Sequence, residues 1–403
     1  MMTEIFDCTA KGTYPALQGD KKSMYPETNT LPKQHTPSLQ GGGVDYHFSE
    51  EDSVLSPSLV YYLDQIEKNT DKVIAMAGGA QRLWPHVKTH KMAAMVRMQT
   101  ERGISRFKCA TIAEARMCAQ EGAEHVLVSY PLTGPAVSLF FNIRRRYAKT
   151  RFWTIGDNIA QLENIGKEAG ESPIDILIDV NAGMNRTGVP FDALAQFYLD
   201  ASKIKGLRIM GLHCYDGHLD IKSAEERKAQ VCALTEKIMS VRAIMEKQGL
   251  EVPVLVMGGT PTFPFLLETP DVFLSPGTIF VNDFGYTEKF KDLFFPAGAA
   301  ILTRVISHPA PGLFTLDTGY KAIASDKIDR GIIAGLPEAK PLAHSEEHWV
   351  WSVKESEAPP IGTVLFIIPA HICPTTALYP GVHVVSRGKL AGYWEVSARD
   401  RFL

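Results

Sequence analysis

Between residues 83 and 278, short apolar runs alternate with longer segments of helical periodicity. The runs are rich in β-branched and aromatic residues, which favour buried strands. They lie at residues 83–89, 106–111, 125–130, 151–156, 175–180, 208–214, 254–259 and 271–278. Helix-start signals support the alternation, namely a capping box of Thr111 and Glu114 and possible N-caps at Asp157 and Ser223. Eight strand–helix units predict parallel strands closed into a (β/α)8 barrel.

The pattern changes near residue 296, where strand-like runs separated by Gly and Pro turns replace the alternation. They lie at residues 301–309, 313–319, 348–354, 363–371 and 383–396. No long helical segment interrupts them, so a mostly-β domain is indicated. We therefore predict an N-terminal arm at 1–50 associated with the β domain, a barrel at 51–295 and the β domain at 296–403.

Charge and cysteine usage narrow the class of protein. The 403-residue chain carries 45 acidic and 42 basic side chains with no block of like charge, which indicates a small-molecule partner rather than nucleic acid or an anionic membrane. The six cysteines are scattered, without the spacing of a disulfide scaffold. Because the sequence has neither a secretory signal nor a run of about 20 apolar residues, we expect a cytoplasmic protein.

The stretch WPHVKTHK ends the first run and carries two lysines and two histidines. On a strand, side chains alternate, so His86, Lys88 and His90 share one face and Val87 faces the apolar layer outside the barrel. Lys88 would then point inward at the strand's carboxyl end, whereas Lys91 would face solvent.

Enclosure and neighbouring positive charge would lower the pKa of Lys88 and free an amine that forms Schiff bases. A solvated basic loop is the alternative that this stretch alone leaves open.

A set of motifs from about Ser56 to the end of the chain resembles the alanine-racemase-type pyridoxal-phosphate enzymes. Within these it is similar to the branch of D-serine dehydratases, D-threonine aldolases and 3-hydroxy-D-aspartate lyases. The motifs are PHVKTHK, DVNAGMNRTGV, GLHCYDGH, VMGGTPT, LSPGTIF and PAHICPTTALY. The resemblance implies a (β/α)8 barrel with a C-terminal β domain, a homodimer with shared active sites, and Lys88 as the residue that binds pyridoxal 5'-phosphate (PLP) covalently.

The seventh and eighth runs end in candidate phosphate ligands, and phosphate sites in barrels commonly follow these two strands. Pro261 suits the first position of a helix, whose N-terminus attracts phosphate, and glycines allow close backbone approach. A Gly-Gly turn without a ligand is the alternative reading. The predicted cofactor contacts here are Gly258, Gly259, Thr260, Gly277 and Thr278.

Other candidates follow the fifth and sixth runs. The resemblance implies that Arg186 approaches the phenolic oxygen of PLP, where a permanent cation stabilises the phenolate; a surface salt bridge is the alternative. Tyr215 is expected to line the cofactor ring with His213, Asp216 and His218, although His213 also suits the core.

His371 and Cys373 lie two residues apart at the expected end of a strand, so both should reach one ion while Ile372 turns away. Such a pair alone is more often packing, but the resemblance implies a divalent metal here. A thiolate favours Zn²⁺. Two protein ligands leave positions open for a substrate hydroxyl.

The His-x-Cys pair resembles the dehydratases, whereas the aldolases tend to carry His-x-Asp. We therefore expect a PLP- and zinc-dependent lyase that eliminates water from a D-3-hydroxy amino acid, such as D-serine or D-3-hydroxyaspartate. Retro-aldol cleavage to glycine and an aldehyde, as in D-threonine aldolase, is the main alternative. Racemisation and non-catalytic PLP binding are further alternatives, and Asp317, Glu346 and His348 border the expected site as weaker candidates.

Overall fold

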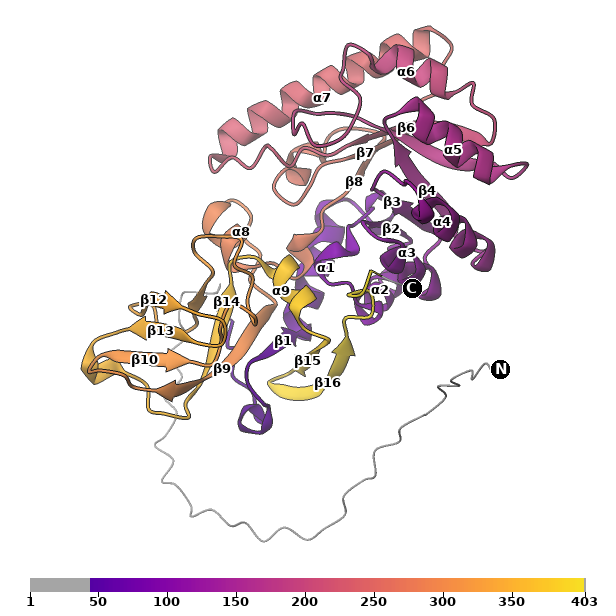
Figure 1. Cartoon of the computed structure of the whole chain (residues 1–403). Helices are drawn as coiled ribbons and strands as arrows, with labels where there is room; N and C mark the ends of the chain where they lie inside the picture. Colours follow the sequence, from indigo (N-terminus) through magenta and orange to yellow (C-terminus); the bar gives the residue numbers. More distant parts are fainter. Residues whose placement is uncertain (1–43, 402–403) are drawn as a thin grey trace, which may run out of the picture. The chain divides into compact units, whose positions relative to one another are not determined.

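The computed structural model describes residues 44–401 and contains two sheets (Figure 1). One is a seven-stranded parallel sheet in the sequential order β2 to β8. Its strands are β2 (Arg106–Cys109), β3 (His125–Val128), β4 (Arg151–Gly156), β5 (Ile174–Asp179), β6 (Leu207–Cys214), β7 (Val254–Met257) and β8 (Val272–Leu274). Seven of the eight predicted runs are therefore strands, and the predicted fold class is confirmed.

The first predicted strand exists only as a short extended segment at residues 83–86. Leu83 bridges Leu274 of β8, and His86 bridges Lys108 of β2, so this segment joins the two edges of the parallel sheet. The Trp84 N–H donates to the Leu274 carbonyl at 2.8 Å. A 3₁₀ turn, η3 (Val87–Thr89), follows at once, so the prediction of a strand through residue 89 was wrong.

Helices follow most of the barrel strands and pack against their outer faces (Figure 1). They are α2 (Ala93–Glu101), α3 (Ile112–Gln120), α4 (Pro135–Arg146), α5 (Ile159–Ala169), α6 (Leu194–Ala201) and α7 (Ala224–Lys247), with α1 (Leu63–Met76) before them and α8 (Phe284–Lys289) after β8. Thr111 and Ser223 cap α3 and α7 as predicted. Asn158 rather than Asp157 caps α5, because the Asp157 carboxylate accepts the Gly188 N–H at 2.8 Å.

The second sheet has nine strands and forms the β domain. They are β1 (Ser58–Tyr62), β9 (Ala299–Ser307), β10 (Leu313–Leu316), β11 (Gly331–Ile333), β12 (Lys340–His344), β13 (Trp349–Ser352), β14 (Val364–Pro369), β15 (Gly381–Ser386) and β16 (Lys389–Glu395). A short helix, α9 (Ile372–Leu378), follows β14.

β1 is a correction to the predicted domain boundary at residue 51, because it lies between β9 and β15 in the second sheet. Leu59 and Tyr61 pack into one apolar cluster and Val60 into another, which requires a strand covered on both faces. Residues 59–62 are all apolar or aromatic, so the sequence shows no alternation of polar and apolar residues that would distinguish this strand from the helix after it.

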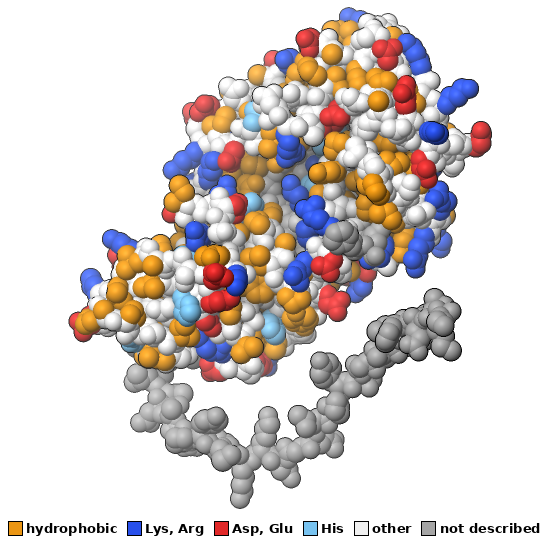
Figure 2. Space-filling model, in the orientation of Figure 1, with side chains coloured by type: hydrophobic (Ala, Val, Ile, Leu, Met, Phe, Trp, Pro, Cys, Tyr) orange, Lys and Arg blue, Asp and Glu red, His pale blue; other side chains and the backbone are white. Residues whose placement is uncertain are grey.

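The last residues of the predicted arm contact the β domain. Tyr46 and Phe48 pack in one apolar cluster with Phe366 of β14, and the Tyr46 hydroxyl donates to the Ala297 carbonyl at 2.9 Å. The rest of the predicted arm lies outside the described residues. No helix within residues 44–401 has the length and apolar character needed to cross a membrane, and basic and acidic side chains are interspersed over the face in Figure 2.

An apolar layer fills the inside of the barrel and supports the polar residues above it. Trp84, Leu127, Trp153 and Leu177 belong to this cluster, although they come from four different segments. Alternation along the extended chain then places His86 and Asp179, two residues beyond Trp84 and Leu177, nearer the carboxyl ends of the strands. Functional residues of barrels collect at this end.

Candidate active site

A cavity of about 1180 Å³ lies where the carboxyl ends of the barrel strands meet the β domain. Both parts of the chain contribute to its wall. Of the predicted site residues, those that line it are Lys88, Tyr215, Asp216, Gly259, Thr260, Gly277, Thr278, His371 and Cys373. Gly258 and Arg186 lie beside the cavity without lining it.

Lys88 sits on the η3 turn and lines the cavity, as the barrel interpretation requires. Its backbone N–H donates to the His86 Nδ1 at 3.3 Å. Val87 is fully buried in the apolar core outside the barrel. Because η3 is a 3₁₀ turn, strand alternation fails beyond it: Thr89 lines the cavity, whereas the buried His90 accepts the Met92 N–H. Burial, followed by the charge of Lys88, lowers the pKa of His86 well below its ordinary value.

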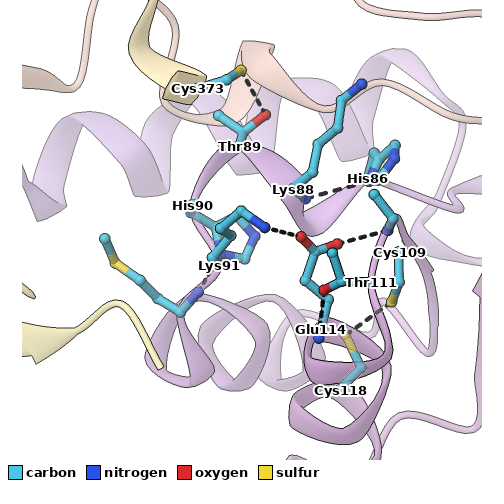
Figure 3. Close-up of polar contacts among 12 residues, drawn as sticks. His86, Lys88, Thr89, His90, Lys91, Cys109, Thr111, Glu114, Cys118 and Cys373 are labelled. Carbon is cyan, nitrogen blue, oxygen red and sulfur yellow. Dashed lines mark hydrogen bonds and ion pairs between the residues drawn. The ribbon is translucent and has the colours of Figure 1, made fainter. Parts of the chain in front are cut away.

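Lys91 does not face solvent, which corrects the prediction (Figure 3). Its ammonium forms an ion pair with Glu114, whose side chain is fully buried. The other Glu114 oxygen accepts the Ala110 N–H at 2.7 Å, and the Lys91 carbonyl accepts the Ala398 N–H at 2.9 Å. The turn that carries Lys88 is thus fastened to α3 and to the C-terminal segment.

Two turns after β7 and β8 form one end of the cavity. Thr260 Oγ1 accepts the N–H groups of Gly277 and Ile279, both at 3.3 Å, which ties the turns together. The helix predicted at Pro261 is a 3₁₀ turn, η4 (Phe263–Leu266).

Within residues 44–401, the N–H groups of Thr260 and Thr278 have no hydrogen-bond partner. Unpaired donors on two adjoining turns fit a phosphate group.

Tyr215 lies among three cations. The Lys88 Nζ and the Lys108 Nζ are each 5.7 Å from its ring centroid, and the Arg186 guanidinium carbon is 5.1 Å away. Sequence reasoning missed Lys108. Burial, followed by the charge of Lys88, lowers the pKa of Lys108 to about 7.

Two buried polar atoms, one in the cavity wall and one outside it, lack hydrogen-bond partners in the described chain. The His213 Nδ1 is 2.7 Å from the Asp179 Oδ1, but the His213 Nε2 and the Asp216 Oδ1 have no hydrogen-bond partner in the described chain. Burial raises the pKa of Asp216 to about 6. His213 is buried and does not line the cavity, which agrees with the core position that the sequence left open as the alternative. His218 is exposed and does not line the cavity. Unsatisfied polar atoms beside a cavity indicate a polar ligand.

His371 and Cys373 approach each other, although not on a strand as predicted. β14 ends at Pro369, and His371 is the N-cap residue of α9, while Ile372 turns into the apolar core. Cys373 Sγ lies 3.3 Å from the Thr89 Oγ1. The His371 Nδ1 is 2.6 Å from a carboxylate oxygen of Asp326, a residue that sequence reasoning missed.

The electrostatics of this pair fit a metal ion. Burial opposes the charge on His371, but its hydrogen bond to Cys373, followed by Asp326, raises its pKa to about 9. Burial also opposes the Cys373 thiolate, yet His371 holds the pKa of that thiol below its ordinary value. An imidazole and a thiolate are good zinc ligands, and zinc displaces the proton of a thiol that it binds. A carboxylate behind the imidazole is a common orienting partner. Residues 44–401 contain no group of three or more His, Cys, Asp or Glu side chains able to hold a metal, so His371 and Cys373 would supply two ligands.

The three weaker candidates lie away from the cavity. The Asp317 carboxylate accepts the Thr303 hydroxyl at 2.6 Å within the β domain. Glu346 is exposed and paired with Lys321 at 2.7 Å, and His348 is exposed on a turn. We assign none of them to the site.

Comparison with known families agrees with this architecture. Residues 62–280 match the family described as the N-terminal domain of alanine racemase, and residues 298–385 match a putative serine dehydratase domain. The barrel of this chain is therefore the domain that characterises the alanine-racemase class of proteins. Because the first match covers more than half of the chain, the protein belongs to this fold-type III family of PLP enzymes.

Three relatives cover most of the chain. A D-threonine aldolase of Arthrobacter sp. is 29% identical over 85% of this chain and 92% of that protein. The D-threonine aldolase structure from Filomicrobium marinum has a TM-score of 0.81 at 25% identity and covers 86% of this chain and 96% of that one.

The third relative is the D-threo-3-hydroxyaspartate dehydratase of Delftia sp. strain HT23, which is 24% identical over 84% of this chain and 96% of that protein. Solved variants of a D-threo-3-hydroxyaspartate dehydratase replace a histidine and, two positions later, a cysteine with alanine. The cysteine variant is described as metal-free and has a TM-score of 0.76 at 22% identity, covering 86% of this chain and 98% of that one.

Proposed function

We propose that this protein is a PLP- and zinc-dependent lyase that eliminates water from D-3-hydroxy amino acids, giving a 2-oxo acid and ammonia. One observation carries the proposal: the Cys373 thiol contacts Thr89, the residue after Lys88, at 3.3 Å. An amine able to hold PLP and a donor pair able to hold zinc therefore face one cavity. In the proposed reaction, PLP acts at the α-carbon of the substrate and zinc at its β-hydroxyl.

The chain's own side chains have separable tasks in this scheme. When bound, PLP accepts the electron pair of the substrate α-carbon and zinc lowers the basicity of the departing hydroxyl. The Lys88 Nζ would hold PLP, and its free amine would take the proton from the substrate α-carbon. The N–H groups of Thr260 and Thr278 would hold the phosphate. Asp326 orients the His371 imidazole through Nδ1.

Retro-aldol cleavage is the second candidate, because two of the similar proteins are D-threonine aldolases. That reaction uses the same cofactor but breaks the Cα–Cβ bond after a base removes the hydroxyl proton. The donor pair favours dehydration. The dehydratase relative carries a histidine and a cysteine two positions apart, the spacing of His371 and Cys373.

Product analysis separates the two reactions. We would incubate the holoenzyme with D-serine, D-threonine and D-threo-3-hydroxyaspartate and measure ammonia, 2-oxo acid and glycine. Equal amounts of ammonia and 2-oxo acid support dehydration. Glycine from D-threonine without ammonia would overturn dehydration in favour of the aldolase, and no turnover of any substrate would overturn the lyase itself.

Variants test the role of the donor pair. We expect Cys373→Ser to lose zinc and turnover while it retains PLP, whereas Cys232→Ser, which alters an exposed cysteine on α7, serves as the matched control. Metal analysis of both variants tests zinc against other divalent ions. The homodimer stays a prediction, which sedimentation measurements test.

A further inference from the structure

Lys108 is a buried lysine on β2 to which the proposed mechanism gives no task. It is 3% exposed, and its side chain lines the cavity. Its N–H donates to the Pro85 carbonyl at 2.8 Å, and Lys108 bridges His86 across the two adjacent segments. The backbone of Lys108 is therefore held in the barrel wall, next to the turn that carries Lys88.

The ammonium group of Lys108 has no anionic partner in the described chain. The Tyr215 ring lies beside this ammonium, with its centroid 5.7 Å from Nζ, and Lys88 and Arg186 also approach the ring. A cation–π contact offsets only part of the cost of burying a charge.

The nearby carboxylates form no ion pair with Lys108. The Asp179 Oδ1 lies 2.7 Å from the His213 Nδ1, and the Asp216 Oδ1 has no hydrogen-bond partner in the described chain. Both carboxylates act on Lys108 only through longer-range attraction, and Lys88 and Arg186 oppose them. The cavity wall beside Tyr215 therefore carries two lysine side chains, Lys88 and Lys108, and no carboxylate of the described chain forms an ion pair with Lys108.

We propose that Lys108 is a ligand-binding residue whose Nζ pairs with an anionic oxygen of the molecule that fills the cavity. This inference rests on the proposed function, which supplies two such oxygens: the phenolic oxygen of PLP and the carboxylate of the amino-acid substrate. The lowered pKa of Lys108 is consistent with this role, because an anion in contact would restore the charged form.

The experiment compares Lys108→Met, which keeps most of the volume but removes the charge, with Lys108→Arg, which retains a cation. Lys228→Met, on the exposed surface of α7, is the matched control. For each protein we would measure the affinity of the apoprotein for PLP and for 3-deoxypyridoxal phosphate, which lacks the phenolic oxygen. We would also measure KM and kcat of the holoenzyme for its best D-amino acid.

The two candidate oxygens, the phenolic oxygen of PLP and the carboxylate of the substrate, predict different results. If Lys108 binds the phenolic oxygen, Lys108→Met weakens PLP binding by about tenfold to a hundredfold, as expected for a hydrogen bond to a charged group, and leaves the deoxy analogue unchanged. If it binds the substrate carboxylate, PLP affinity is unchanged and KM rises by a similar factor with kcat less affected. In both cases Lys108→Arg retains much of the wild-type value.

The inference is overturned if Lys108→Met leaves both PLP affinities and KM within twofold of wild type. It is also overturned if the variant only lowers the urea midpoint of the apoprotein, since that result assigns Lys108 to structure. If the wild-type protein binds PLP and turns over substrate, and the Lys108 variants do the same equally well, only this inference is refuted. A wild-type protein that binds no PLP refutes the proposed function.

Discussion

Replacing Lys91 with methionine tests whether a buried ion pair fastens the turn that carries Lys88. The Glu114 side chain is fully buried and has two partners, the Lys91 ammonium and the Ala110 N–H at 2.7 Å. Removing one member of a buried pair typically costs about 3–5 kcal/mol, because the remaining charge is left uncompensated. Lys91 is 15% exposed, so water can partly replace its ammonium. We therefore expect a loss near the lower end, about 3 kcal/mol.

The assay is urea denaturation of the apoprotein, followed by tryptophan fluorescence. Glu114→Gln added to Lys91→Met should recover most of the loss, because the neutral amide oxygen still accepts the Ala110 N–H without an unpaired charge. Lys203→Met, which breaks the exposed pair with Asp200, should leave the midpoint unchanged. A Lys91→Met variant as stable as the wild type, or a double variant no better than the single one, would refute the reasoning.

Three further outcomes are expected. Gly277→Ala should weaken PLP binding by roughly tenfold in a titration of the apoprotein, because its Cβ would lie 3.1 Å from the His86 carbonyl oxygen and displace the turn; unchanged affinity contradicts this. His371→Ala should abolish turnover yet leave PLP affinity intact, and parallel loss of both would deny the separate metal role. Burial raises the pKa of Asp216 from 3.8 to about 6. Between about pH 4 and 6, Asp216 therefore keeps its proton in the folded protein but loses it in the unfolded chain. Stability contributed by this group therefore falls as pH rises from about 4 to 6, by roughly 3 kcal/mol, and Asp216→Asn should flatten that dependence in urea titrations.

The alternation of strands and helices was readable from sequence because each barrel strand is an apolar run bounded by turn residues. The first strand was overestimated, since residues 83–86 pair only through isolated bridges and a 3₁₀ turn begins at Val87. β1 escaped notice because both of its faces are buried, which removes the alternation that marks a half-exposed strand.

The candidate site was likewise predicted only in part from the sequence. Lys88, His371 and Cys373 were identified from motifs, and each lines the cavity. Lys108 and Asp326 were missed, because a lone lysine in an apolar run and an acid in a loop carry no local signal of what the fold brings near them. Contacts between distant parts of the chain place both residues: Lys108 pairs with His86 of the first segment, and Asp326 contacts His371 at the start of α9.

The most direct test asks which amine holds the cofactor. The wild-type holoenzyme would be reduced with borohydride, digested and mapped by mass spectrometry, with Lys88→Met as the control. We predict a single phosphopyridoxyl label on Lys88 and none on the variant. A label on Lys108, the second amine of the same cavity, or no label on any peptide of the wild type would contradict the account.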